Sequence, residues 1–98
     1  MYDAKKVAVR DAQLRHQELL VPASDLQIYA ANGGNGKFTI GEALKAVHLV
    51  IQKDDSANAL VHFAAASIAI SGSNSDEIVV TGLALAANDV AIIRYELA

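Results

Sequence analysis

The segment VAIIRYEL, residues 90–97, constrains the fold of this chain more than any other stretch. β-Branched residues are dense in it, and successive side chains of a strand point to opposite faces. One face is apolar apart from a tyrosine hydroxyl and is the expected core face: Ala91, Ile93, Tyr95 and Leu97. The other face joins an apolar pair to a charged pair, as expected of a partly buried subunit contact: Val90, Ile92, Arg94 and Glu96.

Turn-forming residues divide the region before this strand into further strands. Residues 77–82 (EIVVTG) predict one strand, flanked by the turn-rich segments GSNSDE and LAAND. Residues 59–71 (ALVHFAAASIAIS) fit either a buried helix or one or two strands, and hairpin spacing around GSNSDE favours strands. The run Ala64 to Ala66 leaves a helical or bulged segment open within it.

Turn-forming residues also separate the expected strands in the middle of the chain. Residues 45–53 predict a strand with Val47, Leu49 and Ile51 on one face and His48, Val50 and Gln52 on the other. Residues 39–46, at the start of this strand, could add a short helical turn. Residues 25–30 and 37–40 flank NGGNG and predict a hairpin.

These elements sum to six or seven antiparallel strands in one small β-sandwich or barrel-like domain, over residues 23–98. Residues 1–22 have strong helix formers without a clean apolar stripe, so an N-terminal arm, a short helix and an edge strand all stay open there. Pro22 ends whichever element precedes it.

Size and composition point to a protein that works by contact. A domain of 98 residues buries a small core, and although 53% of its residues are apolar, only 5% are aromatic. Small side chains bring little buried area each, so contacts between subunits are an obvious way to add stability. The net charge of −3, with no cationic run, disfavours nucleic-acid binding. The chain has no cysteine, which excludes disulfides and thiol chemistry, and we expect a soluble protein without a signal peptide.

No segment predicts a catalytic or ligand-binding site. NGGNGKFT lacks the first glycine and the final Ser or Thr of a phosphate-binding loop, since Ala31 and Phe38 stand there, so a hairpin turn is the better interpretation. The oxygen-rich loops 54–58 and 73–77 do not match a calcium-binding pattern and are interpreted as turns. No Ser, His and Asp set stands out, and we expect no cofactor and no enzymatic activity.

The three histidines lack the spacing of a metal site. His16 has only Glu18 beside it, and His48 and His62 lie on expected strands among apolar residues. Surface or hydrogen-bonded histidines are the expected state, with a contact role as the alternative and no metal ligand predicted. The predicted subunit interface therefore comprises Val90, Ile92, Arg94, Glu96, His48 and His62.

Residues 79–98 (VVTGLALAANDVAIIRYELA) resemble the C-terminal pattern of small structural proteins of tailed-phage virions, the capsid cement or decoration proteins and head-fibre-like domains. The matching positions are Thr81, Gly82, Leu85, Asp89 and the run 90–95. The resemblance implies a non-enzymatic dimeric or trimeric subunit, made in the host cytoplasm, that binds a shell of major capsid protein on the virion surface and stabilises it.

Two other functions are weighed against this one. A β-sandwich module that binds carbohydrate or peptide is the first, although sugar platforms usually present Trp or Tyr and this chain has no Trp and three Tyr. For this module Tyr29 is the aromatic residue to test. A small enzyme is the second, and no residue can be nominated for it.

Overall fold

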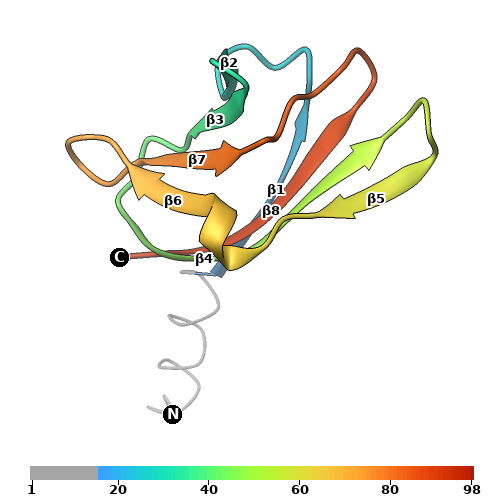
Figure 1. Ribbon diagram of the computed structural model, residues 1–98. Coiled ribbons are helices and arrows are strands. Elements are labelled where there is room, and N and C mark those ends of the chain that lie inside the picture. The colour runs from blue at the N-terminus through green and yellow to red at the C-terminus, as the bar shows by residue number, and fades with distance from the viewer. Residues whose placement is uncertain (1–15) are drawn as a thin grey trace, which may run out of the picture.

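The computed structural model describes residues 16–98, which form two antiparallel sheets of four strands each (Figure 1). Sheet I has the order β1-β8-β4-β5 and contains β1 (His16–Pro22), β8 (Val90–Leu97), β4 (Leu44–Asp54) and β5 (Ala59–His62). Sheet II has the order β2-β3-β7-β6 and contains β2 (Tyr29–Asn32), β3 (Asn35–Thr39), β7 (Glu77–Thr81) and β6 (Ile68–Ser71). The sheets face each other across the core.

The expectation of a mainly β, antiparallel domain is confirmed, but the strand count of six or seven and the barrel alternative are wrong. Each sheet keeps two edge strands, so the described chain does not close into a barrel. Residues 59–71, expected as one or two strands, form two, β5 and β6, and cross from sheet I to sheet II through the 3-10 turn η1 (Ala65–Ser67). The buried-helix alternative is wrong, whereas the helical segment left open at Ala64 to Ala66 is present as this single turn, none of whose residues is buried.

Another strand is β1, at the end of the segment left open as arm, helix or strand. Residues 16–22 pair along their whole length with β8 at the edge of sheet I. Pro22 is tolerated because a proline in a sheet is confined to edge strands and strand ends. The predictions for residues 1–15 lie outside the described residues.

The two predicted hairpins are present. β2 pairs with β3 around the NGGNG turn, and β6 pairs with β7 around residues 72–76. The alternative helical turn within 39–46 is wrong, because Leu44 already starts β4 and Ile40 and Gly41 donate backbone hydrogen bonds to the carbonyl of Asp76.

The core fills the space between the sheets. Its largest fully buried side chains come from both sheets and from the loop that joins β7 to β8: Phe38, Ile78, Leu83, Ile93, Val21, Val50 and Val80. The alternation predicted for residues 90–97 is confirmed. Ala91, Ile93 and Tyr95 are buried, whereas Arg94 on the opposite face is exposed.

The strict alternation predicted for residues 45–53 is wrong. Two irregularities interrupt the pairing of β4 with β8, one between Leu44 and Ala46 and one between Val47 and Leu49. A β-bulge sets two residues of one strand against one of its partner, which shifts the face of every residue beyond it. Val47 therefore packs against the core, as Val50 does, while exposed His48 lies on the other side.

Gly36 is required by the close approach of strand β3 to Leu83 in the connection between β7 and β8. Gly33 and Gly34 have φ of 58° and 89°, the positive values that a two-residue hairpin turn demands at both centres. Gly36 is buried in β3, and a Cβ on it would clash with the side chain of Leu83. NGGNG is thus explained by turn geometry and packing.

We expect Gly36→Ala to destabilise the fold by about 1–3 kcal/mol, the usual cost of overpacking a filled core. Urea unfolding followed by circular dichroism measures this. The matched control is Gly34→Asn, because the space around Gly34 is open and Asn tolerates its left-handed backbone, so its loss is expected to be smaller. Equal losses in the two variants would contradict the packing argument.

Candidate functional site

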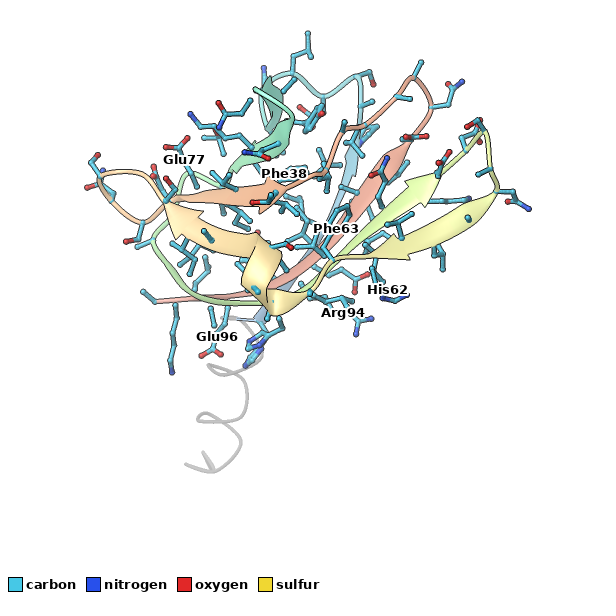
Figure 2. The ribbon with its side chains drawn as sticks, viewed as in Figure 1. Phe38, His62, Phe63, Glu77, Arg94 and Glu96 are labelled. Atoms are coloured by element: carbon cyan, nitrogen blue, oxygen red, sulfur yellow. The ribbon has the colours of Figure 1, made fainter. Side chains whose placement is uncertain are left out.

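The outer face of sheet I, the face turned away from sheet II, carries four of the five ion pairs found among the described residues. Figure 2 shows Arg94, His62 and Glu96 pointing away from the space between the sheets, where Phe38 lies. Because directly paired residues of adjacent strands share a face, the register gives four rows across this outer face. In order they are Pro22-Val90-Lys53-Leu60, Leu20-Ile92-Ile51-His62, Glu18-Arg94-Leu49 and His16-Glu96-Ala46.

The first two rows are largely apolar and open. Leu20 is 62% exposed and Leu60 is 58% exposed, and Ile92 and Ile51 lie between their strands with partial burial. Sheet II packs on the opposite face, so none of these side chains reaches the core. Lys53 and His62 supply the polar groups at the β4 and β5 side of this patch.

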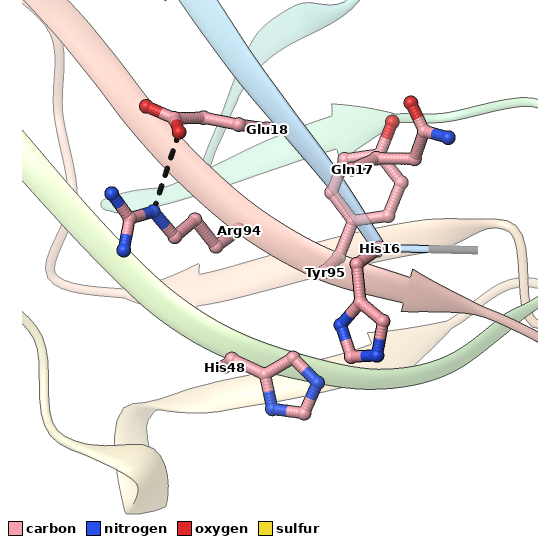
Figure 3. Close-up of a pocket in the computed structure, with 6 residues that line it drawn as sticks. All are labelled: His16, Gln17, Glu18, His48, Arg94 and Tyr95. Carbon is pink, nitrogen blue, oxygen red and sulfur yellow. Dashed lines mark ion pairs between the residues drawn. The ribbon is translucent and has the colours of Figure 1, made fainter. Parts of the chain in front are cut away.

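The third row carries an ion pair. Arg94 Nε lies 3.3 Å from Glu18 Oε2, and both side chains are at least half exposed. Such a surface pair contributes little to stability, since solvent screens it. Its effect is to fix two opposite charges beside the apolar rows (Figure 3).

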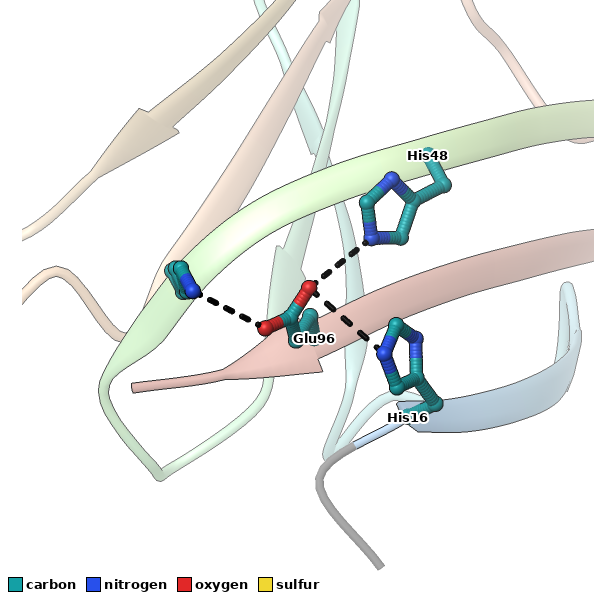
Figure 4. A network of polar contacts seen from close by, with 4 residues as sticks. His16, His48 and Glu96 are labelled. Carbon is teal, nitrogen blue, oxygen red and sulfur yellow. Dashed lines mark hydrogen bonds and ion pairs between the residues drawn. The ribbon is translucent and has the colours of Figure 1, made fainter. Parts of the chain in front are cut away.

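The fourth row forms a polar cluster around the carboxylate of Glu96 (Figure 4). His48 Nε2 lies 3.3 Å from Glu96 Oε1, and His16 Nε2 lies 3.7 Å from the same oxygen. Lys45 Nζ lies 3.3 Å from the other oxygen, Oε2. The two imidazole rings stack with centroids 5.6 Å apart and planes inclined by 20°.

The strand order and the two bulges create this cluster. β8 brings Glu96 between β1 and β4, and His16 is directly opposite it on β1. The irregularities at the start of β4 put Lys45 and His48 on the outer face beside Ala46, the residue opposite Glu96. Sequence reasoning missed the cluster because its members are far apart in the chain and only the strand order joins them.

The environment keeps Glu96 ionised. The hydrogen bond from Lys45 is the largest influence that holds the pKa of this carboxyl below its usual value, and the hydrogen bond from His48 adds to it. Partial burial acts in the opposite direction. The cluster therefore offers a carboxylate, fixed in orientation, between two imidazoles.

A shallow depression of about 230 Å³ lies beside the cluster, lined by His16, Gln17, Glu18, His48, Arg94 and Tyr95. In Figure 3 the side chains of His16 and His48 lie on one side of the strands, whereas those of Gln17 and Tyr95 point to the other side. Tyr95 is buried, and burial raises the pKa of its phenol.

The structure places all six residues of the predicted interface on this outer face. Val90 and Ile92 belong to the apolar rows, Arg94 to the ion pair, and Glu96 and His48 to the cluster. His62 stands apart from the cluster, on β5 opposite Ile51.

Tyr29 offers no platform for a sugar ring. It is buried, packs against Phe38 with ring centroids 5.4 Å apart and planes inclined by 43°, and accepts a hydrogen bond from the backbone N–H of Leu85. Tyr95 is buried as well, and Phe63 packs partly against the core. None of these three aromatic residues is presented flat to solvent, so none of them forms a platform for a sugar ring.

Comparison with known proteins gives no match: no protein-family model, no curated protein and no solved structure matches this chain. Within residues 16–98, no helix is long and apolar enough to cross a membrane.

The other notable carboxylate, that of Asp89, is buried and accepts hydrogen bonds from three parts of the fold. It is 2% exposed, and its Oδ2 accepts hydrogen bonds from Gln52 Nε2 and from the N–H of Ala86, both at 2.9 Å. Its Oδ1 accepts one from the N–H of Asp55 at 2.9 Å. These bonds join the start of β8 to the turn after β4 and to the connection from β7, so Asp89 serves the fold.

We expect Asp89→Asn to destabilise the protein at pH 7. Both oxygens of the Asp89 carboxylate accept hydrogen bonds, and in asparagine one of them is replaced by an NH₂ group, which would face an N–H donor and leave it without an acceptor. The backbone N–H groups of Asp55 and Ala86 and then Gln52 hold the pKa of Asp89 below its ordinary value of 3.8. A lowered folded-state pKa stabilises the protein above pH 4 and loses this effect as pH falls through that folded-state value. Urea unfolding should show the largest difference from wild type at pH 6–7 and a smaller one near pH 3.

The control for this series is Asp55→Asn, which changes an exposed carboxylate in the adjacent turn and leaves the donating backbone N–H in place. Little effect is expected at either pH. A difference for Asp89→Asn that stays constant down to pH 3 would contradict the role assigned to the ionised form.

Proposed function

We propose that this protein is a non-enzymatic virion structural subunit, a capsid cement or decoration protein that binds a shell of major capsid protein through the outer face of sheet I. The observation that carries the proposal is the pair of open apolar rows on that face, with Leu20 and Leu60 more than half exposed. Leu20 and Leu60 lie on the two edge strands of sheet I, and the partly buried Ile92 and Ile51 lie on the two strands between them. A contiguous apolar patch that is open to solvent is a mark of an interaction surface.

The layout of the face suits a protein contact. Stable interfaces have an apolar centre and a polar rim, and they use few fixed charges near the centre. Here Leu20, Ile92 and Ile51 run across three strands, and the Arg94–Glu18 pair borders them. Opposite charges fixed at such a border select orientation more than affinity.

The area of the face supports an assembly in which many copies bind together. Four strands at about 4.8 Å spacing and seven residues at about 3.4 Å cover roughly 19 by 24 Å, or about 450 Å². A standard stable interface needs about 800 Å² per partner. A single copy would bind weakly, whereas a dimer or trimer on a repeating shell gains affinity because its contacts are linked.

The resemblance of residues 79–98 to virion structural proteins supplies the choice of partner. In this fold the matching positions lie in the connection from β7 in sheet II to β8 in sheet I. Gly82 has φ of 80°, and the backbone N–H of Leu85 donates a hydrogen bond to the hydroxyl of Tyr29. Asp89 accepts the hydrogen bonds that fix the start of β8. The same passage delivers β8, which carries the central row residues of the outer face.

The proposal predicts that Leu20→Asp combined with Leu60→Asp weakens binding to shells of the major capsid protein encoded with this chain by at least tenfold. Burying one leucine contributes about 1.5–3 kcal/mol, and each tenfold change in affinity corresponds to about 1.4 kcal/mol. Co-sedimentation with shells measures the binding, and light scattering of the free protein measures its oligomeric state.

Leu26→Asp is the matched control, because Leu26 is 80% exposed but lies in the loop between β1 and β2. Its shell binding should equal that of wild type. Wild-type protein that neither binds nor stabilises the shells would overturn the proposal, and an equal loss in the control would move the contact away from the outer face.

A further inference from the structure

Three potential metal ligands converge at the polar end of the outer face, from three adjacent strands. His16 on β1, Glu96 on β8 and His48 on β4 place their ligand atoms within 4.8 Å of one another. The proposed contact with a shell depends on the apolar rows and does not require this convergence. We propose that His16, His48 and Glu96 form a Zn²⁺ site with the fourth coordination position open to solvent.

The distances match a shared ion. Zinc binds imidazole nitrogen and carboxylate oxygen at about 2.0–2.2 Å in tetrahedral sites, so two of its ligand atoms lie about 3.3 Å apart. His48 Nε2 and Glu96 Oε1 are 3.3 Å apart, and His16 Nε2 and Glu96 Oε1 are 3.7 Å apart. Two edges of the coordination polyhedron are therefore within a few tenths of an ångström of their final length.

The spacing of the two imidazole rings is also close to that expected around a shared ion. For two imidazoles bound to one tetrahedral ion through Nε2, ring centroids about 3.2 Å from the metal would be about 5.2 Å apart. The centroids of His16 and His48 are 5.6 Å apart. The rings are stacked, with planes inclined by 20°, so at least one imidazole must turn until its Nε2 lone pair points at the ion. Both side chains are about half exposed, which gives them the freedom to turn.

The ligand set selects the class of ion. Two imidazoles and one carboxylate suit zinc, whereas Mg²⁺ and Ca²⁺ prefer oxygen ligands throughout. Three protein ligands leave one tetrahedral position, and the side chains of His16 and His48 are 54% and 47% exposed, so water can occupy it. The open position faces the same side as the proposed shell contact.

Lys45 positions the carboxylate without using the oxygen that the ion needs. Its Nζ lies 3.3 Å from Oε2, while both histidines address Oε1. The side chain of Glu96 is only 17% exposed, so its orientation is restricted before any ion arrives. Holding a ligand in place by a partner outside the coordination sphere raises metal affinity.

A bound ion would join β1, the edge strand that leads out of residues 1–15, to β8 and β4. An ion that binds the folded chain and not the unfolded one raises the unfolding midpoint according to its concentration and affinity. The site therefore predicts stabilisation by zinc without any shell present.

The test uses the full chain after treatment with a chelator and its removal. Calorimetric titration with Zn²⁺ at pH 7.5 should show one ion per chain, and Zn²⁺ should raise the thermal midpoint while Mg²⁺ leaves it unchanged. His48→Asn and Glu96→Gln should each weaken zinc binding by at least tenfold.

Two matched controls lie on the same face. His62→Asn removes a histidine on β5 opposite Ile51, and Glu18→Gln removes a carboxylate paired with Arg94. Both should bind zinc as wild type does. The proposal would be overturned if His62→Asn lost as much zinc affinity as His48→Asn. It would also be overturned if the wild-type protein bound zinc no more tightly than His48→Asn.

Nitrogen-detected NMR of the imidazoles separates ligation from loss of folding. Zinc should shift the Nε2 resonances of His16 and His48 and leave those of His62 in place. Shifts of all three together would mean adventitious binding and would overturn the site. Leu20→Asp should bind zinc normally, so failure of the shell contact and failure of the metal site give different results.

Discussion

The position of β8 between β1 and β4 is the constraint on which the rest of this structure depends. Both hydrogen-bonding edges of the strand are occupied, and its two faces have opposite tasks. Ala91, Ile93 and Tyr95 close the core against sheet II, while Ile92 and Glu96 form the middle of an apolar row and the centre of the polar cluster. A shift of one residue would exchange these faces, removing the core and the outer face together.

The limited size of the core explains why the outer face matters. Phe38 and Tyr29 supply its aromatic contact with each other, and most other buried residues are Val, Ile, Leu or Ala. Each of these contributes modest buried area, yet the chain leaves Leu20 and Leu60 largely open to solvent. Aliphatic side chains withheld from a small core are more readily explained by a contact than by stability of the isolated chain.

Much of the fold follows from local sequence, and the cluster does not. The alternation of residues 90–97, the NGGNG turn and the hairpin around residues 72–76 depend on neighbouring residues, so the sequence predicts them. The face of His48 depends on a bulge that has no mark in the sequence, and its meeting with His16 depends on which strands are neighbours. The pairing of strands that are distant in sequence therefore determines which residues form the candidate site. The sequence prediction assumed a strict period of two in β4 and so placed His48 and Leu49 on opposite faces.

The two proposals concern separate parts of one surface, and their separation has a physical basis. Leu20 and His16 are four residues apart on β1, and Ile92 and Glu96 are four apart on β8, which places the apolar row about 14 Å from the polar cluster along the strands. Changes more than about 10 Å apart without shared partners act nearly independently. The Arg94–Glu18 row lies between the two parts and forms the charged border of the apolar rows. A partner seated on the apolar rows would therefore meet the cluster only at its border, where a bound cation would add positive charge without altering the packing beneath.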